Sequence, residues 1–319
     1  MKYSNEWSYA EAQSVNMSET KIAELHSRIK NEEIKTCVIF KQNKIVYEHF
    51  VDDNVRETVQ KVNSITKSVL SLITGIAIHN GYITDMDTRV ACFFPEISAS
   101  DRKGNLTIRH LLTMTSGLNW PGNKEMISSE NWVNHILNSP LRNTPGEQMH
   151  YSSGDSHLLS AIIKKASGKT PLALAEEHLF TPLNIQQYEW EKDPQGLSIG
   201  GWGMWLNTYD LVKIGKMVLD NGQWNDKQLI SKEWLHQAST AHTTTKIGNQ
   251  SYGYHWWVSD SSNGKQPDFY YAAGRGGQYI FIVPALDLVT VFTSEYETNK
   301  GGIKPYQLFV QFILGAVVK

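Results

Sequence analysis

The stretch that decides the fold runs from Val62 to Gly81 and reads VNSITKSVLSLITGIAIHNG. From Val69 onward apolar residues recur at helical spacing until Asn80-Gly81, a pair typical of a helix end. A run this apolar on nearly every side predicts a helix buried inside a domain, with Asn63 or Ser64 as its N-cap. Lys67 does not fit this pattern. It places a positive charge in the first turn, where the helix dipole favours an anion.

The composition of the whole chain is that of an ordinary globular protein. It has 319 residues, 40% of them hydrophobic and 19% charged, enough for one large domain or two smaller ones. The formal net charge is −2, and no stretch has the basic character that nucleic-acid binding requires. Nucleic acid is therefore not an expected partner.

The cysteines and the N-terminus bear on the cellular compartment. Cys37 and Cys92 both lie in apolar stretches, and we interpret them as buried free thiols. The N-terminal residues lack the apolar region of a signal peptide, and no run approaches the ~18 apolar residues of a membrane span. We expect a soluble, cytoplasmic chain without a membrane span. An exported mature protein is the alternative.

Strand-like segments lie at both ends of the chain, and helical patterns fill the middle. Near the N-terminus a helix over 17–30 and a hairpin over 36–50 are expected, and near the C-terminus strands over 252–258, 268–274, 278–284 and 286–295 precede a helix over 305–318. This order predicts an α+β fold: an antiparallel sheet built from both chain ends, flanked by helices, with an inserted all-helical region. We expect one unit over 1–319, with 17–61 and 245–319 as the sheet part and 62–244 as the mostly helical part.

Seven helices are expected in that middle region. They are 64–79, 108–113, 132–138, 156–166, 172–178, 208–221 and 232–238.

Ser64 and Lys67 form a Ser-x-x-Lys pair, which by itself is a weak signal. The same spacing recurs at Ser18/Lys21, Ser27/Lys30, Ser100/Lys103 and Ser262/Lys265, and the simplest interpretation is a helix cap followed by a surface lysine. Only Ser64, however, opens a long apolar helix. Residues three apart share a helix face, so a buried lysine could take the proton of the serine hydroxyl. That needs a neutral amine, which means lowering the lysine pKa by about 3 units, or about 4 kcal/mol.

Two further segments carry polar groups at positions where a site could form. Tyr151 precedes a new helix in HYSSGDSHLLSAII, and its phenol could relay a proton if it lies near Lys67; a core tyrosine that anchors a turn is the alternative. Gly274-Arg275-Gly276-Gly277 lies between two strand-like runs. Its glycines could let a substrate approach the backbone, and an amide there could join that of Ser64 in an oxyanion hole. The alternative is a plain glycine turn.

Together these motifs resemble those of the serine β-lactamase-like superfamily, which comprises class C β-lactamases, DD-peptidases, related esterases and nylon-oligomer hydrolases. The resemblance rests on Ser64-Ile-Thr-Lys67, Tyr151-Ser-Ser153 and Gly274-Arg-Gly-Gly277-Gln278, and on the segments 107–118, 200–222 and 278–294. It implies a β-lactamase/transpeptidase-like fold and no cofactor.

The resemblance also implies roles for individual residues. Ser64 would be the nucleophile, Lys67 its base and Tyr151 the proton relay. The strand carrying the third motif would face the substrate, so the expected substrate-binding residues are Ser153, Arg275, Gly276, Gly277 and Gln278.

The chain departs from the β-lactamase pattern at two places. In those enzymes the second motif usually ends in Asn, and here Ser153 stands there. Their third motif usually opens with Lys, whereas here Arg275 is the cation at hand. At both positions this chain is more similar to the esterase and amide-hydrolase branches than to the β-lactamases.

Other catalytic sites find little support. The eleven histidines show no HExxH or Cys/His ligand spacing, so no metal site is expected. His150 beside Tyr151 suggests a Ser–His–Asp triad, but the Gly-x-Ser-x-Gly motif is absent. Trp120 and Trp202 lie in glycine-rich loops and could line an acyl or leaving-group pocket.

The expected function is a serine hydrolase that cleaves a small ester, amide or peptide-like substrate through a Ser64 acyl-enzyme. The alternative is a β-lactamase, or a penicillin-binding DD-peptidase or sensor that β-lactams acylate. A scaffold that retains the motifs without activity is a third reading. Neither the natural substrate nor the oligomeric state follows from the sequence.

Overall fold

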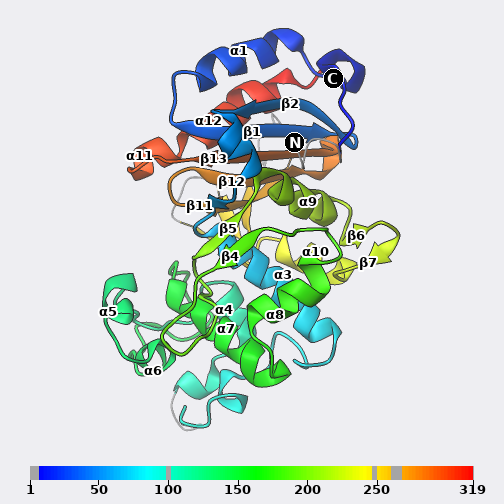
Figure 1. The fold of residues 1–319 in the computed structure, drawn as a ribbon. Helices are drawn as coiled ribbons and strands as arrows, with labels where there is room; N and C mark the ends of the chain where they lie inside the picture. The colour runs from blue at the N-terminus through cyan, green and yellow to red at the C-terminus, as the bar shows by residue number, and fades with distance from the viewer. Residues whose placement is uncertain (1–6, 98–101, 246–249, 260–267, 319) are drawn as a thin grey trace.

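The computed structural model describes residues 7–97, 102–245, 250–259 and 268–318. Two of the alternative Ser-x-x-Lys pairs, at Ser100 and Ser262, therefore fall partly or wholly outside the described residues. An eight-stranded antiparallel sheet spans the upper half of the molecule and takes strands from both ends of the chain (Figure 1). In spatial order its strands are β2 (Lys44–Phe50), β1 (Ile34–Lys41), β13 (Leu288–Ser294), β12 (Gln278–Val283), β11 (Phe269–Gly274), β10 (Trp257–Ser259), β9 (Gln250–Tyr252) and β8 (Thr243–Thr244).

Both faces of this sheet are buried. Along β12, Tyr279 and Phe281 point into one apolar cluster, and Ile280 and Ile282 into the other, as the two-residue period of a strand requires. The first cluster is covered by α1 (Glu19–Ile29) and by the C-terminal segment that begins with α11 (Asn299–Gly302) and α12 (Lys304–Leu308). The second cluster is covered by α9 (Thr208–Leu219) and α3 (Ile65–His79).

The helix α3 occupies the centre of the molecule. All thirteen residues from Ile65 to Ala77 are buried, which confirms the prediction of a helix enclosed on every side. It ends at Asn80 and at Gly81, whose φ of 73° is the left-handed conformation that glycine adopts readily.

Most remaining helices surround α3 in the lower half of Figure 1. The other helices are α2 (Asp53–Glu57), α4 (Ile108–Leu112), α5 (Asn123–Ile127), α6 (Trp132–Leu137), α7 (Ser153–Ser167), α8 (Pro171–Ala175) and α10 (Lys232–Ala238).

The predicted α+β class is confirmed, and the structure differs from the prediction in detail. The middle region is not all-helical, because it contains β4 (Tyr188–Trp190) and β5 (Met204–Leu206), which form a three-stranded sheet with β3 (Gln60–Lys61) of the sheet part, and also the hairpin β6 (Gln223–Trp224)–β7 (Lys227–Gln228). One of its helices, α9, packs on the large sheet. The two-part division of the chain stays a prediction.

Three local expectations were wrong. The strand expected over 252–258 is interrupted, because His255 has a φ of 60°, which no strand accommodates. The C-terminal helix changes to a wider turn over Phe309–Ile313 and to a tighter one over Leu314–Ala316. Cys37 is buried as expected, whereas Cys92 is exposed.

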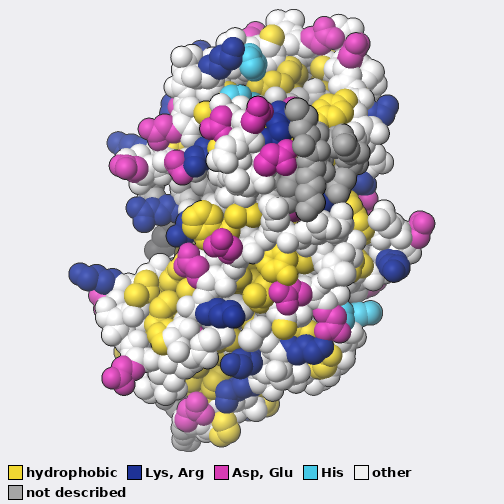
Figure 2. Space-filling view, in the orientation of Figure 1, with side chains coloured by type: hydrophobic (Ala, Val, Ile, Leu, Met, Phe, Trp, Pro, Cys, Tyr) yellow, Lys and Arg dark blue, Asp and Glu magenta, His cyan; other side chains and the backbone are white. Residues whose placement is uncertain are grey.

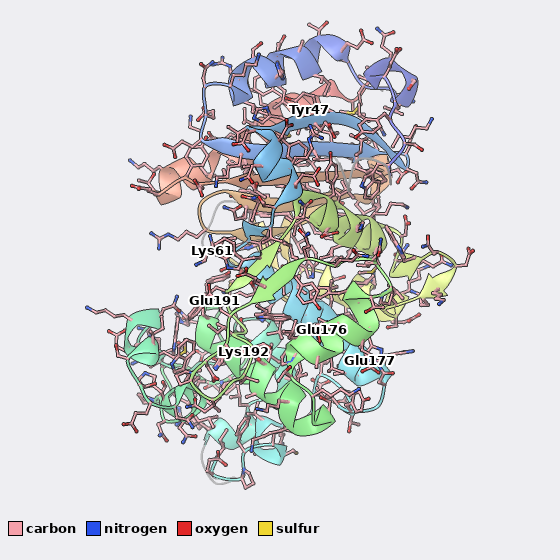
Figure 3. All side chains as sticks on the ribbon, in the orientation of Figure 1. Tyr47, Lys61, Glu176, Glu177, Glu191 and Lys192 are labelled. Atoms are coloured by element: carbon pink, nitrogen blue, oxygen red, sulfur yellow. The ribbon has the colours of Figure 1, made fainter. Side chains whose placement is uncertain are left out.

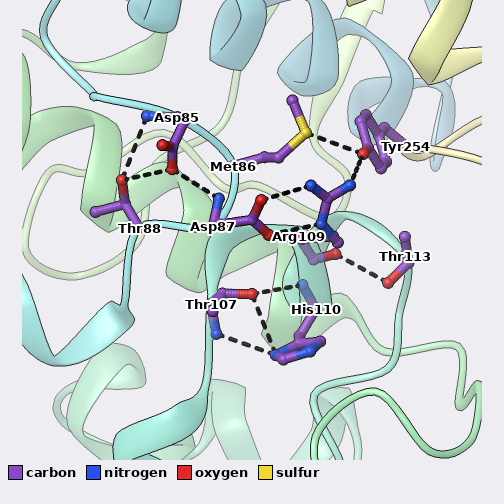
Figure 4. A network of polar contacts seen from close by, with 9 residues as sticks. All are labelled: Asp85, Met86, Asp87, Thr88, Thr107, Arg109, His110, Thr113 and Tyr254. Carbon is purple, nitrogen blue, oxygen red and sulfur yellow. Dashed lines mark hydrogen bonds and ion pairs between the residues drawn. The ribbon is translucent and has the colours of Figure 1, made fainter.

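A polar network holds the interrupted segment in place (Figure 4). Arg109 on α4 makes two hydrogen bonds of 2.7 Å to the carboxylate of Asp87 and a third to the hydroxyl of Tyr254. Next to Tyr254, the amide of His255 donates to the carbonyl of Leu112, and its own carbonyl accepts from Ser68 on α3. The back of α3 is thereby tied to α4.

The surface of the molecule carries both signs of charge. On the face shown in Figure 2, Lys and Arg side chains are interspersed with Asp and Glu. Within the described ranges, no helix has both the length and the apolar character needed to cross a membrane.

Candidate active site

Ser64 is the N-cap residue of α3, yet its side chain does not act as a cap. It has a helical backbone (φ −72°, ψ −1°), and no cap hydrogen bond involves its hydroxyl. The preceding Asn63 takes a left-handed φ of 48°, and Thr66 donates to its carbonyl in place of a cap. The Ser64 hydroxyl is therefore available to other groups.

Lys67 lies one turn further along α3, and its amine reaches back to the serine. Lys67 Nζ is 3.0 Å from Ser64 Oγ, 3.1 Å from Ser153 Oγ and 2.6 Å from the carbonyl oxygen of Gly201. Ser64 Oγ is also 3.4 Å from the Gly201 oxygen. The Ser-x-x-Lys pair thus forms a compact polar cluster together with residues from two other segments.

The environment of Lys67 favours the neutral amine. The residue is only 1% exposed, and burial lowers the pKa of Lys67 to about 7. A carboxylate beside the amine would oppose this shift, but the contacts are hydroxyls and a carbonyl. Nearby His255 is also uncharged, because burial, followed by the charge of Lys67, lowers the pKa of His255 to about 3.

Tyr151 covers this cluster from the solvent side. Its ring centroid is 4.9 Å from Lys67 Nζ, and the ring stacks on Trp257 at 5.8 Å and meets Tyr252 edge-on at 6.2 Å. Desolvation of the phenol raises the pKa of Tyr151 to about 12, although 43% of the residue is exposed, and a hydrogen bond with Ser64 offsets part of the rise. At neutral pH the phenol keeps its proton.

The second motif opens α7, whose first turn lies against a glycine-rich loop. Ser153 contacts Lys67, and Trp120 packs on the next residue, since a Cβ added to Gly154 would lie 2.9 Å from its ring. Trp202 follows Gly201 directly, and its ring lies 5.8 Å from that of Trp132. Each tryptophan therefore lies beside a residue that contacts Lys67: Trp120 beside Ser153, and Trp202 beside Gly201.

The third motif is a strand end followed by a turn. Gly274 is the last residue of β11, residues 275–277 form the turn, and Gln278 begins β12. Strand β11 lies inside the sheet, but β10 pairs only with residues 269–271, so residues 272–274 have an open side. Among the described residues only this half of the strand lacks a pairing strand on that side, and here Ala272 is buried while Ala273 and Gly274 are half-buried.

This strand end touches the backbone that leads into α3. A Cβ added to Gly274 would lie 2.3 Å from the carbonyl oxygen of Val62, and Asn63 Nδ2 donates to the carbonyl of Arg275 at 2.7 Å. Among the described residues, no hydrogen bond engages the amide N–H of Ser64 or of Arg275. The start of α3 and the turn after β11 thus lie in contact, and each has one backbone N–H without a partner among the described residues.

The other residues of the third motif maintain the turn. The Gln278 side chain is buried and donates to the carbonyl of Ser294 at 2.5 Å, so it does not face a substrate. Gly276 and Gly277 have positive φ angles of 85° and 91° and pack against Ser294 and Tyr296. The Arg275 side chain is exposed.

A cavity of about 750 Å³ opens beyond Asn63 and Arg275. Its walls include Lys61 and Trp205, which face each other with Lys61 Nζ 5.5 Å from the indole ring. Lys61 also lies 3.5 Å from Glu191 of the neighbouring loop, and the two side chains are labelled in Figure 3. Sequence reasoning missed this cavity, because its residues come from five separate segments.

No group of three or more potential metal ligands occurs among the residues that the structure describes. The candidate site is therefore the cluster around Ser64. Comparison with known proteins places the chain, though not the individual site residues, in a family. The family model described as Beta-lactamase matches residues 37–307, most of the chain. The chain belongs to the Beta-lactamase family.

Individual relatives are distant in sequence and close in fold. The 6-aminohexanoate-dimer hydrolase of Paenarthrobacter ureafaciens is 19% identical over 87% of this chain and 76% of its own length. A structure from Bacillus anthracis, provisionally named a 6-aminohexanoate-dimer hydrolase, superposes on this chain with a TM-score of 0.78. The two are 16% identical, and the match covers 96% of this chain and 86% of the other. EstCE1, a hydrolase with promiscuous acyltransferase activity, superposes with a TM-score of 0.74, at 16% identity over 91% and 96% of the two chains.

These results confirm the resemblance to the serine β-lactamase-like superfamily. The protein is a serine hydrolase of this family, with a β-lactamase-like fold.

Proposed function

We propose that the protein hydrolyses a small linear ester or amide through an acyl-enzyme at Ser64. The observation that carries the proposal is the environment of Lys67: its amine is buried, has no carboxylate partner within the described part of the chain, and lies 3.0 Å from Ser64 Oγ. With a pKa of about 7, a large fraction of Lys67 is neutral at physiological pH and can accept the Ser64 proton.

Lys67 and Tyr151 have complementary roles in the proposed mechanism. Lys67 accepts the Ser64 proton as Oγ attacks the substrate carbonyl, and becomes an ammonium. Tyr151, which keeps its proton up to about pH 12, donates that proton to the leaving group and is reprotonated from Lys67. In deacylation, water attacks the acyl carbon and gives a proton to the same groups. They return a proton to Ser64 Oγ as the acyl bond breaks. Two titratable groups whose pKa values lie far apart thus supply the base and the acid.

The backbone supplies the stabilisation of the tetrahedral intermediate. The amides of Ser64 and Arg275 lack partners among the described residues and lie on segments joined by the Asn63–Arg275 hydrogen bond. We propose that these two N–H groups form the oxyanion hole. Donors of this kind contribute about 2.7–4 kcal/mol each when tested by mutation.

The substrate class rests on chemistry and on the relatives. Ser153, Trp120 and Trp202 border the cluster and offer one hydroxyl and two aromatic rings, which suits a small, largely apolar acyl or leaving group. The curated relative is named for hydrolysing a 6-aminohexanoate dimer, and EstCE1 is named as a hydrolase with promiscuous acyltransferase activity. A linear ester or amide is compatible with both.

Labelling of Ser64 together with turnover tests the proposal. A fluorophosphonate probe should modify Ser64 alone, and p-nitrophenyl butyrate should be hydrolysed through many turnovers, with both activities absent from Ser64→Ala. Labelling that persists in Ser64→Ala would refute the role of this serine. A burst of one equivalent without further turnover would indicate the penicillin-binding or sensor alternative.

A further inference from the structure

A buried histidine–aspartate pair lies behind the glycine-rich loop of the site. His157, on the second turn of α7, places Nε2 3.1 Å from Oδ2 of Asp193, and both side chains are fully buried. Neither residue belongs to the proposed proton relay. A buried carboxylate is costly to maintain, so the effect of this pair on the surrounding structure is of interest.

The hydrogen bonds around the pair determine its protonation. The amide of Gly200 donates to Nδ1 of His157 at 3.4 Å, so Nδ1 carries no proton and Nε2 donates its own to Asp193. The other carboxylate oxygen of Asp193 accepts from the amides of Gln195 and Leu197 at 2.9 and 2.8 Å. Burial opposes ionisation, yet the hydrogen bonds from His157 and Leu197 outweigh it and hold the pKa of Asp193 below its ordinary value.

The loop held in this way contains the carbonyl that contacts Lys67. Gly201 follows Gly200 directly, and its oxygen is 2.6 Å from Lys67 Nζ. The loop packs closely against α7. A Cβ added to Gly200 would lie 2.1 Å from the carbonyl oxygen of Ser156, and one added to Gly201 would lie 2.6 Å from Cβ of Ser153. A shift of the His157–Gly200 contact therefore moves Gly201.

The position of this carbonyl determines where the amine lone pair points. A neutral lysine has two N–H groups and one lone pair, and Lys67 has three polar neighbours. When Gly201 and Ser153 accept the two hydrogens, the lone pair is directed at Ser64, as a general base requires. Without the Gly201 acceptor the amine can rotate, and the lone pair is no longer confined to that direction.

We propose that His157 and Asp193 are positioning residues that hold the Gly201 carbonyl in place and so direct the Lys67 lone pair at Ser64. This inference rests on the proposed function, because it assigns the pair an effect on the Lys67 base. It distinguishes the pair from an ordinary core contact: losing it should slow the chemical step more than it weakens substrate binding.

Two substitutions at His157 separate the two hydrogen bonds. His157→Leu removes both. His157→Asn keeps an oxygen near the position of Nδ1, so it can still accept from Gly200 while it loses the donor to Asp193. For His157→Leu we expect kcat on p-nitrophenyl butyrate to fall by about 10–100-fold, the scale of a misplaced catalytic group, with KM within about threefold of wild type. His157→Asn should recover a substantial part of kcat.

Asp193→Asn tests the other half of the pair at constant volume. An amide has one acceptor oxygen where the carboxylate has two, so its nitrogen must face either His157 or the amides of Gln195 and Leu197. If it faces His157, the histidine proton moves to Nδ1 and opposes the Gly200 N–H. We expect a loss of kcat similar to that of His157→Leu, together with slower labelling of Ser64 by the fluorophosphonate.

Ser160→Ala is the matched control. Ser160 is also buried on α7 and donates to the same loop, to the carbonyl of Ser198 at 2.5 Å, but it does not contact Gly200 or Gly201. It should lower the melting temperature and leave kcat within about threefold of wild type. The inference is overturned if folded Asp193→Asn or His157→Leu keeps wild-type kcat, or if Ser160→Ala slows turnover equally. If His157→Leu does not fold, Asp193→Asn decides. A wild-type protein that fails to label at Ser64 refutes the proposed function instead.

Discussion

The amine of Lys67 lies 3.0 Å from the hydroxyl of Ser64 and, among the residues that the structure describes, contacts no carboxylate, although it is almost completely buried. A lysine in this position destabilises the folded protein, because burial of an ammonium is not compensated by an opposite charge. The cost falls when the amine is neutral, which is the form that a general base needs.

Lys67→Arg should be nearly as inactive as Lys67→Ala. Arginine keeps the positive charge, but it does not lose its proton in proteins and so cannot accept one from Ser64. We expect kcat/KM on p-nitrophenyl butyrate to fall at least ~10²-fold for both variants, the scale of general-base removal. Steady-state kinetics on folded protein checks this. An arginine variant with near-normal turnover would make Lys67 a structural cation.

The pH dependence of the reaction should follow the titration of Lys67. Because the neutral amine is the active form, kcat/KM should rise with pH and reach half its plateau near pH 7, the pKa of Lys67. Asp155 also titrates in this range, since burial raises the pKa of Asp155 to about 7. Asp155→Asn is therefore the control, and its kcat/KM should still fall as the pH drops below 7. A wild-type profile that is flat from roughly pH 6 to 9 contradicts the prediction.

Lys67→Met should be inactive and more stable than wild type. The unfolded chain holds the lysine proton up to about pH 10.5, whereas the folded chain releases it at about pH 7. The penalty of burial is therefore complete below pH 7 and shrinks as the pH rises toward 10.5. Because the pKa of Lys67 falls from 10.5 to about 7, the full penalty is about 5 kcal/mol, and lost hydrogen bonds offset about 1 kcal/mol each.

Urea unfolding of wild type and Lys67→Met at two pH values provides the measurement. At pH 7 the free energy of unfolding of the methionine variant should exceed that of wild type by about 1–3 kcal/mol. The difference should decrease at pH 9.5, because only the wild-type protein gains stability with pH through this group. A variant that is less stable at both pH values would show that the amine is not desolvated.

Gly274→Ala should impair the oxyanion hole more than the fold. The added methyl group would lie 2.3 Å from the carbonyl oxygen of Val62 and force β11 away from the segment that leads to Ser64. We expect kcat to fall by about 10²-fold, comparable to the loss of one oxyanion donor. Gly315→Ala is the control, because an added Cβ meets nothing within 4 Å there, and it should keep full activity. Equal kcat values for the two variants would argue against a role of this strand end.

The sequence was sufficient to predict that Lys67, Tyr151 and Ser153 lie around Ser64, and insufficient to predict the backbone carbonyl that Lys67 contacts. Lys67 follows from helical spacing, and Tyr151 and Ser153 from motif order. The carbonyl of Gly201 makes the shortest contact with Lys67, yet a carbonyl is present in every residue and gives no signal in composition or spacing. Only the glycine-rich character of the loop indicated a close backbone approach.

The misplaced strand has a similar explanation. Residues 252–258 have the aromatic, β-branched composition of a strand, and the left-handed turn at His255 is imposed by tertiary contacts with Leu112 and Ser68. The side chain of Gln278 was expected to face the substrate, and it is turned toward Ser294 because the strand pairing leaves that backbone carbonyl to be satisfied. Contacts between distant segments decide both positions.

Small activated esters should be better substrates than cephalosporins. The resemblance implies that efficient β-lactamases hold the substrate carboxylate with a lysine that opens the third motif. In this chain the two residues before Gly274 are Ala272 and Ala273, and the cation of the motif, Arg275, lies in the turn with an exposed side chain. An exposed ion pair contributes only about 0–1 kcal/mol, whereas hydrogen bonds to a well-placed charged group contribute about 1.5–3 kcal/mol. The second motif offers the hydroxyl of Ser153, which already contacts Lys67, where an asparagine would offer two donors.

An ester such as p-nitrophenyl butyrate requires only the nucleophile, the base and the oxyanion hole, so these absences should affect it little. We expect its kcat/KM to exceed that of a chromogenic cephalosporin by at least tenfold, which corresponds to about 1.4 kcal/mol of transition-state stabilisation. Both substrates should be measured with one preparation, and Ser64→Ala should abolish both activities. A cephalosporin preferred by tenfold or more would show that the exposed Arg275 turns inward to bind the carboxylate, and Arg275→Ala would then remove that preference while leaving ester hydrolysis intact.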